Sequence, residues 1–195
     1  MDQIIKVLHD MIDISESEMQ GFLSRTFTKT YRQNESLSAY STFANEFFFI
    51  NKGLVQVTFT DRDGKEHGIH FAWENQFISD YSSFLLRKPA FYNIVAVEET
   101  HVVVLSRSAI EWAYNHIRQG QKLGRLIGEF FFMSRDDRVK NLFGRTPKER
   151  FEALNEFFPQ VHQRVSPQMI AAYLGISTIH LGRLKKELTR DPAAQ

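Results

Sequence analysis

Cysteine is absent from the 195 residues. Its absence excludes disulfides, thiolate zinc sites, cysteine-ligated iron–sulfur clusters and a cysteine nucleophile, and it is compatible with a reducing cytoplasm. Long apolar runs are lacking too. No run of about 18 residues is apolar enough to span a bilayer, and no early segment has the form of a signal peptide. A cytoplasmic protein without membrane contact is therefore expected.

Strong net charge is also lacking, because the chain carries a formal charge of only +1. The charge is nevertheless uneven. Residues 145–195 hold eight Lys or Arg and five Asp or Glu, whereas residues 1–144 hold sixteen and eighteen. A mildly acidic N-terminal region and a basic C-terminal region are typical of a regulatory part joined to a nucleic-acid-binding part.

The most informative segment runs from Val165 to Leu188 and predicts two helices joined by a tight turn. Ser166 is a good N-cap, Gly175 is suited to end the first helix in a left-handed conformation, and Ser177 is suited to cap the second. The side chains expected to be buried are Ile170, Ala171, Leu174, Leu181, Leu184 and Leu188. The residues expected to face the DNA major groove are Ser177, Thr178, Ile179, His180, Arg183, Lys185 and Lys186. Such helix pairs also occur as plain packing units, which is the alternative.

Three regions with different residue patterns precede this segment. Residues 1–24 have helical spacing of apolar side chains, and residues 26–105 contain short β-rich runs with frequent turn signals, which predict a β-sandwich or jelly roll. Within it, residues 47–50 and 55–59 are expected to form one hairpin around Gly53, and Asp63-Gly64 is expected to join the second of these strands to residues 66–72. Helices are then predicted at 108–115 and 119–143, and a further helix is predicted to start at the capping box Thr146-Pro147-Lys148-Glu149 with the core residues Phe151, Leu154, Phe157 and Phe158.

The long helix at 119–143 has an apolar face that is wider than one seam. We expect it to pack on its own β-domain on one side and on a second copy on the other, with Leu123, Ile127 and Phe130 as dimerisation residues. Gly120, Gly124 and Gly128 share one side of this helix. Close approach of a second backbone explains them, and a chance occurrence on a solvent face is the alternative.

This order of elements resembles the Crp/Fnr family of bacterial transcription regulators, most sharply between Ser166 and Leu188. The resemblance implies an α+β fold with a sensing β-domain at 1–115, a dimerisation helix at 116–144 and a helix-turn-helix domain at 145–195. It implies a homodimer that reads two-fold double-stranded DNA, with RNA polymerase as a partner and no enzymatic activity. Thr178, Ile179 and Arg183 would then face the bases, and Asp191–Gln195 would leave no room for the β-wing that often follows.

Cyclic-nucleotide-binding members of this family hold a phosphate with a Gly-Glu pair and an Arg that is followed by Ser or Thr. Here Ser79-Asp80 and Ala90-Phe91 occupy those positions, so we expect that the phosphate site is lost and that any small-molecule effector is not a cyclic nucleotide. The pocket is expected to be filled by its own aromatic side chains or to take an apolar or differently charged ligand. Its predicted residues are Phe71, Phe77, Ser79, Asp80, Tyr81, Arg87, Lys88, Phe91 and Tyr92.

Three other functions compete with this interpretation. One is a signalling module that still binds a cyclic nucleotide, and another is an adaptor whose basic end binds protein. A third is a cupin-like metal enzyme, to which His67, His70 and Glu74 draw attention. Because His67 and His70 are three apart on a predicted strand, their side chains point to opposite faces, and His101 is isolated. No metal or cofactor is therefore expected.

Overall fold

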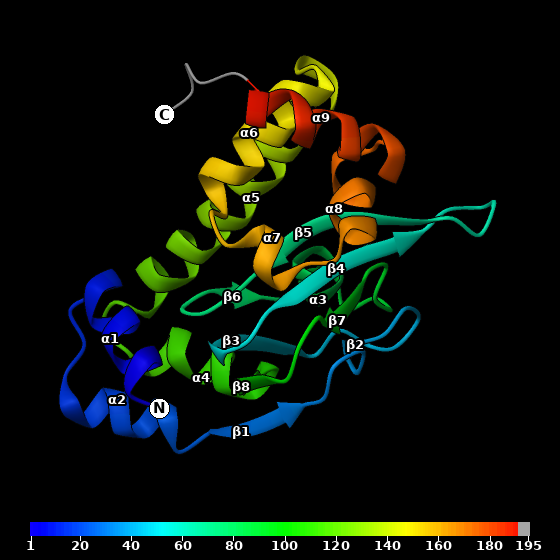
Figure 1. The fold of residues 1–195 in the computed structure, drawn as a ribbon. Helices are drawn as coiled ribbons and strands as arrows, with labels where there is room; N and C mark the ends of the chain where they lie inside the picture. The colour runs from blue at the N-terminus through cyan, green and yellow to red at the C-terminus, as the bar shows by residue number, and fades with distance from the viewer. Residues whose placement is uncertain (191–195) are drawn as a thin grey trace. The chain divides into compact units, whose positions relative to one another are not determined.

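The computed structural model describes the backbone of residues 1–190 and the side chains of residues 1–187 (Figure 1). Its helices are α1 (Asp2–Met11), α2 (Glu16–Leu23), α3 (Tyr81–Leu86), α4 (Arg107–His116), α5 (Gly120–Gly144), α6 (Pro147–Phe157), α7 (Val161–Arg164), α8 (Pro167–Leu174) and α9 (Thr178–Arg190). Its strands are β1 (Thr26–Tyr31), β2 (Ser36–Ser38), β3 (Glu46–Lys52), β4 (Val55–Thr60), β5 (Glu66–Ala72), β6 (Phe77–Ile78), β7 (Asn93–Ala96) and β8 (Thr100–Ser106). The side chain of Leu188 and the segment 191–195, on which the expectation of a missing wing depends, lie outside the described residues.

The described strands form two four-stranded sheets with the orders β1-β8-β3-β6 and β2-β7-β4-β5. Antiparallel pairing places Phe48 opposite Val104 and Phe49 opposite Val103 at the centre of the first sheet. All four side chains are almost fully buried, as is Tyr31, whose ring meets that of Phe48 edge-on. The predicted β-domain of short strands is therefore confirmed.

The single hairpin predicted around Gly53 is wrong. β3 pairs with β8 and β6, whereas β4 lies in the other sheet between β7 and β5. At Gly53 φ is +110°, and a Cβ there would lie 2.5 Å from the Thr100 hydroxyl oxygen. The chain thus crosses from one sheet to the other at a turn that only glycine fits. The second connection is confirmed, since β4 and β5 are neighbours joined through Asp63-Gly64.

A local capping signal sets the start of α2. Ser15 and Glu18 form a capping box, in which the Ser15 amide donates to the Glu18 carboxylate at 2.8 Å. Helix α1 contacts β3, and α2 contacts β1 and α4. Figure 1 shows α2 next to α4 in the lower part of the view. Helix α5 begins and ends within one residue of its predicted bounds.

The contacts divide the chain into two compact units. The roll unit contains residues 1–57 and 71–134, and the helical unit contains residues 58–70 and 135–195. This division differs from the one expected from the sequence in two ways. The outer end of the β4–β5 hairpin groups with the C-terminal helices, and α5 contributes to both units.

In the helical unit, α6 begins at the predicted capping box. The Thr146 amide donates to the Glu149 carboxylate at 2.7 Å, and the Glu149 amide donates to the Thr146 hydroxyl at 3.3 Å. Phe151, Leu154 and Phe158 are buried as predicted. The prediction is wrong for Phe157, which is 51% exposed, because Phe158 occupies the buried position at the end of the helix.

Candidate nucleic-acid interface and sensor site

Helices α8 and α9 carry the caps predicted for them. The Ser166 hydroxyl accepts from the Met169 amide at 3.3 Å, and the Ser177 hydroxyl accepts from the His180 amide at 3.2 Å. Gly175 ends α8 in the left-handed region with φ +68°. The side chains buried as predicted are Ile170, Ala171, Leu174, Leu181 and Leu184. This arrangement seats α9 on α8 through one apolar face and leaves the other face outward.

The outward face of α9 contains most of the predicted DNA-facing residues. Ser177, Thr178, Ile179, Arg183 and Lys186 are exposed, whereas His180 and Lys185 are partly buried. Arg183 has no hydrogen-bond or ion-pair partner among the described residues. A Cβ at Gly182, on the same face, would meet nothing within 4 Å. Packing within the chain therefore does not require this glycine, although close approach of an outside surface would.

A buried arginine, which the sequence analysis missed, fixes α8 within the helical unit. The Arg138 guanidinium donates to the Gly68 carbonyl of β5 at 2.8 Å and to the Tyr173 carbonyl of α8 at 2.6 Å. It also lies 4.1 Å from the Tyr173 ring centroid. Burial lowers the pKa of Arg138. No local pattern distinguishes this arginine from exposed ones, because its partners lie far away in sequence.

His70 of β5 lies close to the same cations. Burial, together with the positive charges of Arg135 and Arg138, lowers the pKa of His70 from 6.5 to about 4. Its ring centroid is 6.4 Å from that of Phe157. The imidazole is thus held neutral at physiological pH, in a position where protonation is costly.

The predicted phosphate cassette in the roll unit is filled by one of its own carboxylates. Asp80 is only 1% exposed. It caps α3 by accepting from the Ser83 amide and the Ser82 hydroxyl, both at 3.2 Å. It also accepts from the Phe91 amide at 2.7 Å and from the Tyr92 amide at 3.1 Å. Four donors that face one point are thereby satisfied without any ligand.

Residues 28–116 match the cyclic nucleotide-binding domain family. The match covers most of the roll unit, from β1 to the end of α4, and it includes Asp80 and its four donors. We refer to these residues as the CNB domain. No curated protein sequence matches this chain.

Solved structures of transcription regulators share the fold. FixK2 from Bradyrhizobium japonicum has 18% identity and a TM-score of 0.71, with 85% of each chain covered. The c-di-GMP-responsive global regulator CLP of Xanthomonas campestris has 14% identity and a TM-score of 0.67, covering 91% of this chain and 93% of that one. A transcriptional regulator of the Crp/Fnr family from Eubacterium rectale has 10% identity and a TM-score of 0.72, covering 91% and 84%. At such identities the likeness shows the fold alone, which is a domain of antiparallel strands followed by a helical C-terminal region.

The CNB domain does not gather all the residues predicted to line an effector pocket. Ser79 is buried and donates to the Glu46 carbonyl at 2.9 Å. Arg87 turns outward to pair with Glu111 at 3.2 Å, and Lys88 is exposed. Phe91 is 53% exposed with Tyr92 edge-on to it, and Phe71 is buried. Among the described residues, no arginine or lysine makes a hydrogen bond or ion pair with the Asp80 carboxylate, so this part of the cassette offers a phosphate no counter-charge.

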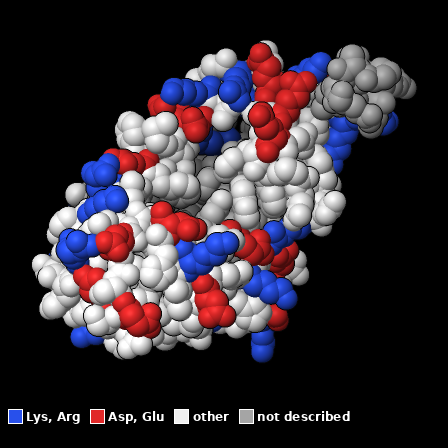
Figure 2. Space-filling model, turned by 90° about the vertical axis from the view of Figure 1, so that its left-hand side faces the viewer, with Lys and Arg blue, Asp and Glu red and all other residues white. Residues whose placement is uncertain are grey.

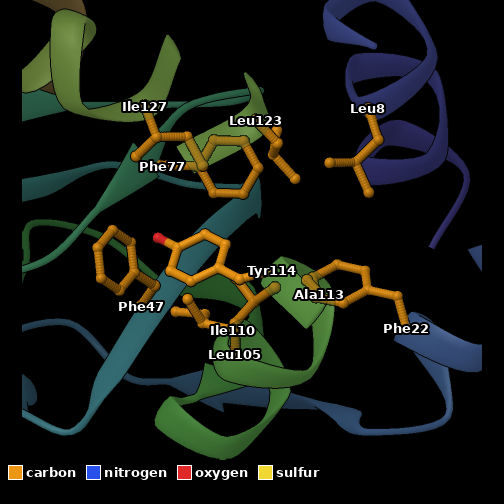
Figure 3. A pocket seen from close by; sticks show the side chains of 10 residues that line it. All are labelled: Leu8, Phe22, Phe47, Phe77, Leu105, Ile110, Ala113, Tyr114, Leu123 and Ile127. Carbon is orange, nitrogen blue, oxygen red and sulfur yellow. The ribbon is translucent and has the colours of Figure 1, made fainter. Parts of the chain in front are cut away.

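A different pocket lies where α1, α2 and α5 meet β3, β6, β8 and α4 of the CNB domain (Figure 3). The Tyr114 ring lies across it, and Leu8, Phe22 and Leu123 are among the apolar side chains around the ring. The sequence analysis did not find this pocket. The glycines of α5 were its only signal, because they face the residues that shape it.

Three glycines of α5 allow close packing within the chain. A Cβ at Gly120 would lie 2.1 Å from the Ala113 carbonyl oxygen, and one at Gly124 would lie 2.7 Å from the Tyr114 ring. At Gly128 the nearest atom would be the Tyr81 hydroxyl at 3.2 Å. The interpretation as close approach of a second backbone is confirmed for Gly120, and that backbone belongs to α4.

The predicted dimerisation residues differ in their surroundings. Leu123 is 4% exposed because it packs against α1 and α2 of its own chain, so it has no surface left for a second copy. Ile127 is partly buried, and Phe130 is 41% exposed. Further exposed apolar side chains on α5 are Phe132, Met133, Val139 and Phe143.

The other charged side chains do not indicate a further binding site or a metal site. On the face shown in Figure 2, acidic and basic residues are interspersed without a broad area of one sign. His67 pairs with Asp61 at 2.6 Å, and the Glu74 carboxylate accepts from the Gly53 amide at 2.7 Å. Across the described residues, no three His, Asp or Glu side chains gather in a way that would hold a metal. Within the same residues, no helix combines the length and apolarity needed to cross a bilayer.

Proposed function

We propose that this protein is a homodimeric DNA-binding transcription regulator whose CNB domain responds to a small molecule other than a cyclic nucleotide. The observation that carries the proposal is the outward face of α9, where Ile179, Arg183 and Lys186 are exposed around an unpacked glycine. A basic helix seated on another helix is suited to the major groove, with Arg183 pairing with guanine and Ile179 touching a thymine methyl.

The test is a titration of the purified chain against mixed-sequence double-stranded DNA at several salt concentrations. Binding should weaken linearly with the logarithm of salt, because each phosphate contact releases a counterion. Selection of tight-binding sequences should then yield a two-fold site with half-sites about one helical turn apart. A chain that fails to bind DNA at low salt, or binds a protein partner through α9 instead, would contradict the proposal.

The second copy is proposed to pack along α5 through Phe130 and the exposed apolar side chains beyond it. A charge placed in such a seam would be desolvated without a partner. Phe130→Asp should therefore give a monomer in sedimentation, with the CNB domain still folded. Phe131→Asp is the matched control: Phe131 is 8% exposed and stacks on Tyr81, so this change should unfold the roll unit instead. A normal dimer of Phe130→Asp would place the seam elsewhere.

A cyclic-nucleotide-binding signalling module is the second candidate function, and the match of residues 28–116 favours it. Against it stands Asp80, whose carboxylate occupies the amides and repels an incoming phosphate. Calorimetry with cyclic AMP and cyclic GMP should give no binding at physiological concentration. Micromolar binding would favour the signalling module. RNA polymerase is proposed as the partner of the DNA-bound dimer, which transcription from a selected site would test.

A further inference from the structure

Two small cavities in the roll unit share two lining residues. One is the Tyr114 pocket of Figure 3, with a volume of about 30 Å³. The other has a volume of about 140 Å³ and lies between α1, the turn before β6, and α5. Phe77 and Ile127 line both cavities, and Figure 3 shows these two side chains together at one end of the Tyr114 pocket. They form the partition between the cavities, so a rotation of the Phe77 side chain would join them.

The lining of both cavities is uncharged. The larger one is bounded by Val7, Met11 and Phe130 with the amides of Asn75 and Gln76, and Tyr114 carries the one polar side chain in the smaller one. A carboxylate or ammonium group entering here would lose its water without gaining a counter-charge. The ligand that fits these walls is therefore uncharged.

Tyr114 supplies the directional contact of the smaller cavity. Its hydroxyl has no hydrogen-bond partner among the described residues, and Figure 3 shows it pointing toward Phe47 inside the pocket. Burial, and the neighbouring Tyr81, raise the pKa of Tyr114, so the hydroxyl keeps its proton. A donor left unpaired in apolar surroundings favours a ligand with an acceptor oxygen.

Size limits the ligand further. Dry cavities of roughly 150 Å³ lined by Leu, Ile and Phe in other proteins accept benzene. The larger cavity here has about that volume, and the smaller one adds room for a substituent that reaches Tyr114.

We propose that these two cavities form one binding site for an uncharged, benzene-sized compound whose single carbonyl oxygen accepts a hydrogen bond from Tyr114. The site is separate from the Asp80 cassette, and α5 forms one of its walls through Ile127 and Phe130. Its role as the effector site depends on the proposed function, whereas binding itself does not.

Calorimetry of the full chain with acetophenone and ethylbenzene tests the site, because the two probes share size and ring and differ in one oxygen. Acetophenone should bind about tenfold more tightly than ethylbenzene, as expected for one hydrogen bond. Tyr114→Phe should abolish that preference. Tyr81→Phe, which removes the hydroxyl of a tyrosine that lines neither cavity, should keep that preference. Val7→Trp, a change at the partly buried mouth, should block both probes without altering the melting temperature.

Absence of binding by both probes would overturn the proposal, as would a preference for acetophenone that survives in Tyr114→Phe. A DNA titration with and without acetophenone separates this inference from the proposed function. Tyr114-dependent binding with unchanged DNA affinity would keep the site and overturn its effector role. Tyr114-dependent binding in a chain that fails to bind DNA would overturn the proposed function alone.

Discussion

The Asp80 cassette and the outward face of α9 handle their polar groups in opposite ways. At the cassette, one buried carboxylate satisfies four donors of its own chain. On α9, Arg183 is exposed and has no partner among the described residues. A family match would mark the cassette as the binding site, yet its chemistry is complete without a ligand. The comparison teaches that a matched family position can have all its polar groups satisfied internally, whereas the proposed binding face leaves its arginine without a partner among the described residues.

The largest effect is expected at Asp80, whose carboxylate satisfies four donors of its own chain. Asp80→Ala removes the acceptor of three buried amides and should lower the free energy of unfolding by about 3 kcal/mol or more in urea. Asp80→Asn keeps one acceptor oxygen and should lose distinctly less. A loss below about 1 kcal/mol for the alanine variant would show that the cassette amides find other partners.

Acid should weaken the helical unit through His70. Its pKa is about 4 when folded and near 6.5 when unfolded, so the unfolded chain takes up a proton first as pH falls. The contribution of His70 to stability is complete above pH 6.5 and is lost between there and pH 4, by at most about 3 kcal/mol. His70→Leu should flatten this part of the pH profile of urea unfolding, and an unchanged profile would contradict the assignment.

The outward face of α9 is tested by the substitution Arg183→Ala. Because the side chain has no hydrogen-bond or ion-pair partner in the described part of the chain, stability should change by less than about 0.5 kcal/mol. Affinity for a selected DNA site should fall by about 1–3 kcal/mol, with relaxed preference at one base pair. Lys186→Ala is the matched control and should weaken binding to all sequences alike. Unaltered base preference in Arg183→Ala would remove Arg183 from base recognition.

The smallest effect is expected at Gly182, where one substitution distinguishes a change in thermal stability from a change in DNA affinity. Gly182→Ala adds a methyl group where nothing lies within 4 Å, so thermal stability should rise by up to about 1 kcal/mol. If DNA approaches this backbone closely, affinity should fall in the same variant. A gain in stability with unchanged affinity would show that Gly182 faces solvent only.

The features that were predictable from sequence are those decided within a few residues. The caps at Ser15, Thr146, Ser166 and Ser177 were expected or follow directly from local spacing, and the bounds of α5 were correct to one residue. Strand pairing was not predictable, since a turn at Gly53 is compatible both with a hairpin and with a change of sheet.

The same distinction between local and long-range interactions applies to the candidate sites. The outward face of α9 follows from helical periodicity, so its residues were found from sequence. That the phosphate site is lost stays a prediction from the sequence. The contacts of Asp80 were not predictable, because its carboxylate accepts from the Phe91 amide, which lies eleven residues further along the chain. Arg138 and Tyr114 were missed because their roles depend on neighbours brought together by tertiary packing.

The packing of α5 against Ala113 and Tyr114 also has a consequence for local opening. Glycines weaken a helix by about 1 kcal/mol each relative to alanine, so the first turns of α5 gain little from their own propensity. They hold their shape because α4 lies against them. Amide hydrogens between Gly120 and Gly128 should therefore exchange with solvent together with those of α4, as one cooperative unit. The exchange rate of these amides then reports how often the contact between α4 and the start of α5 opens.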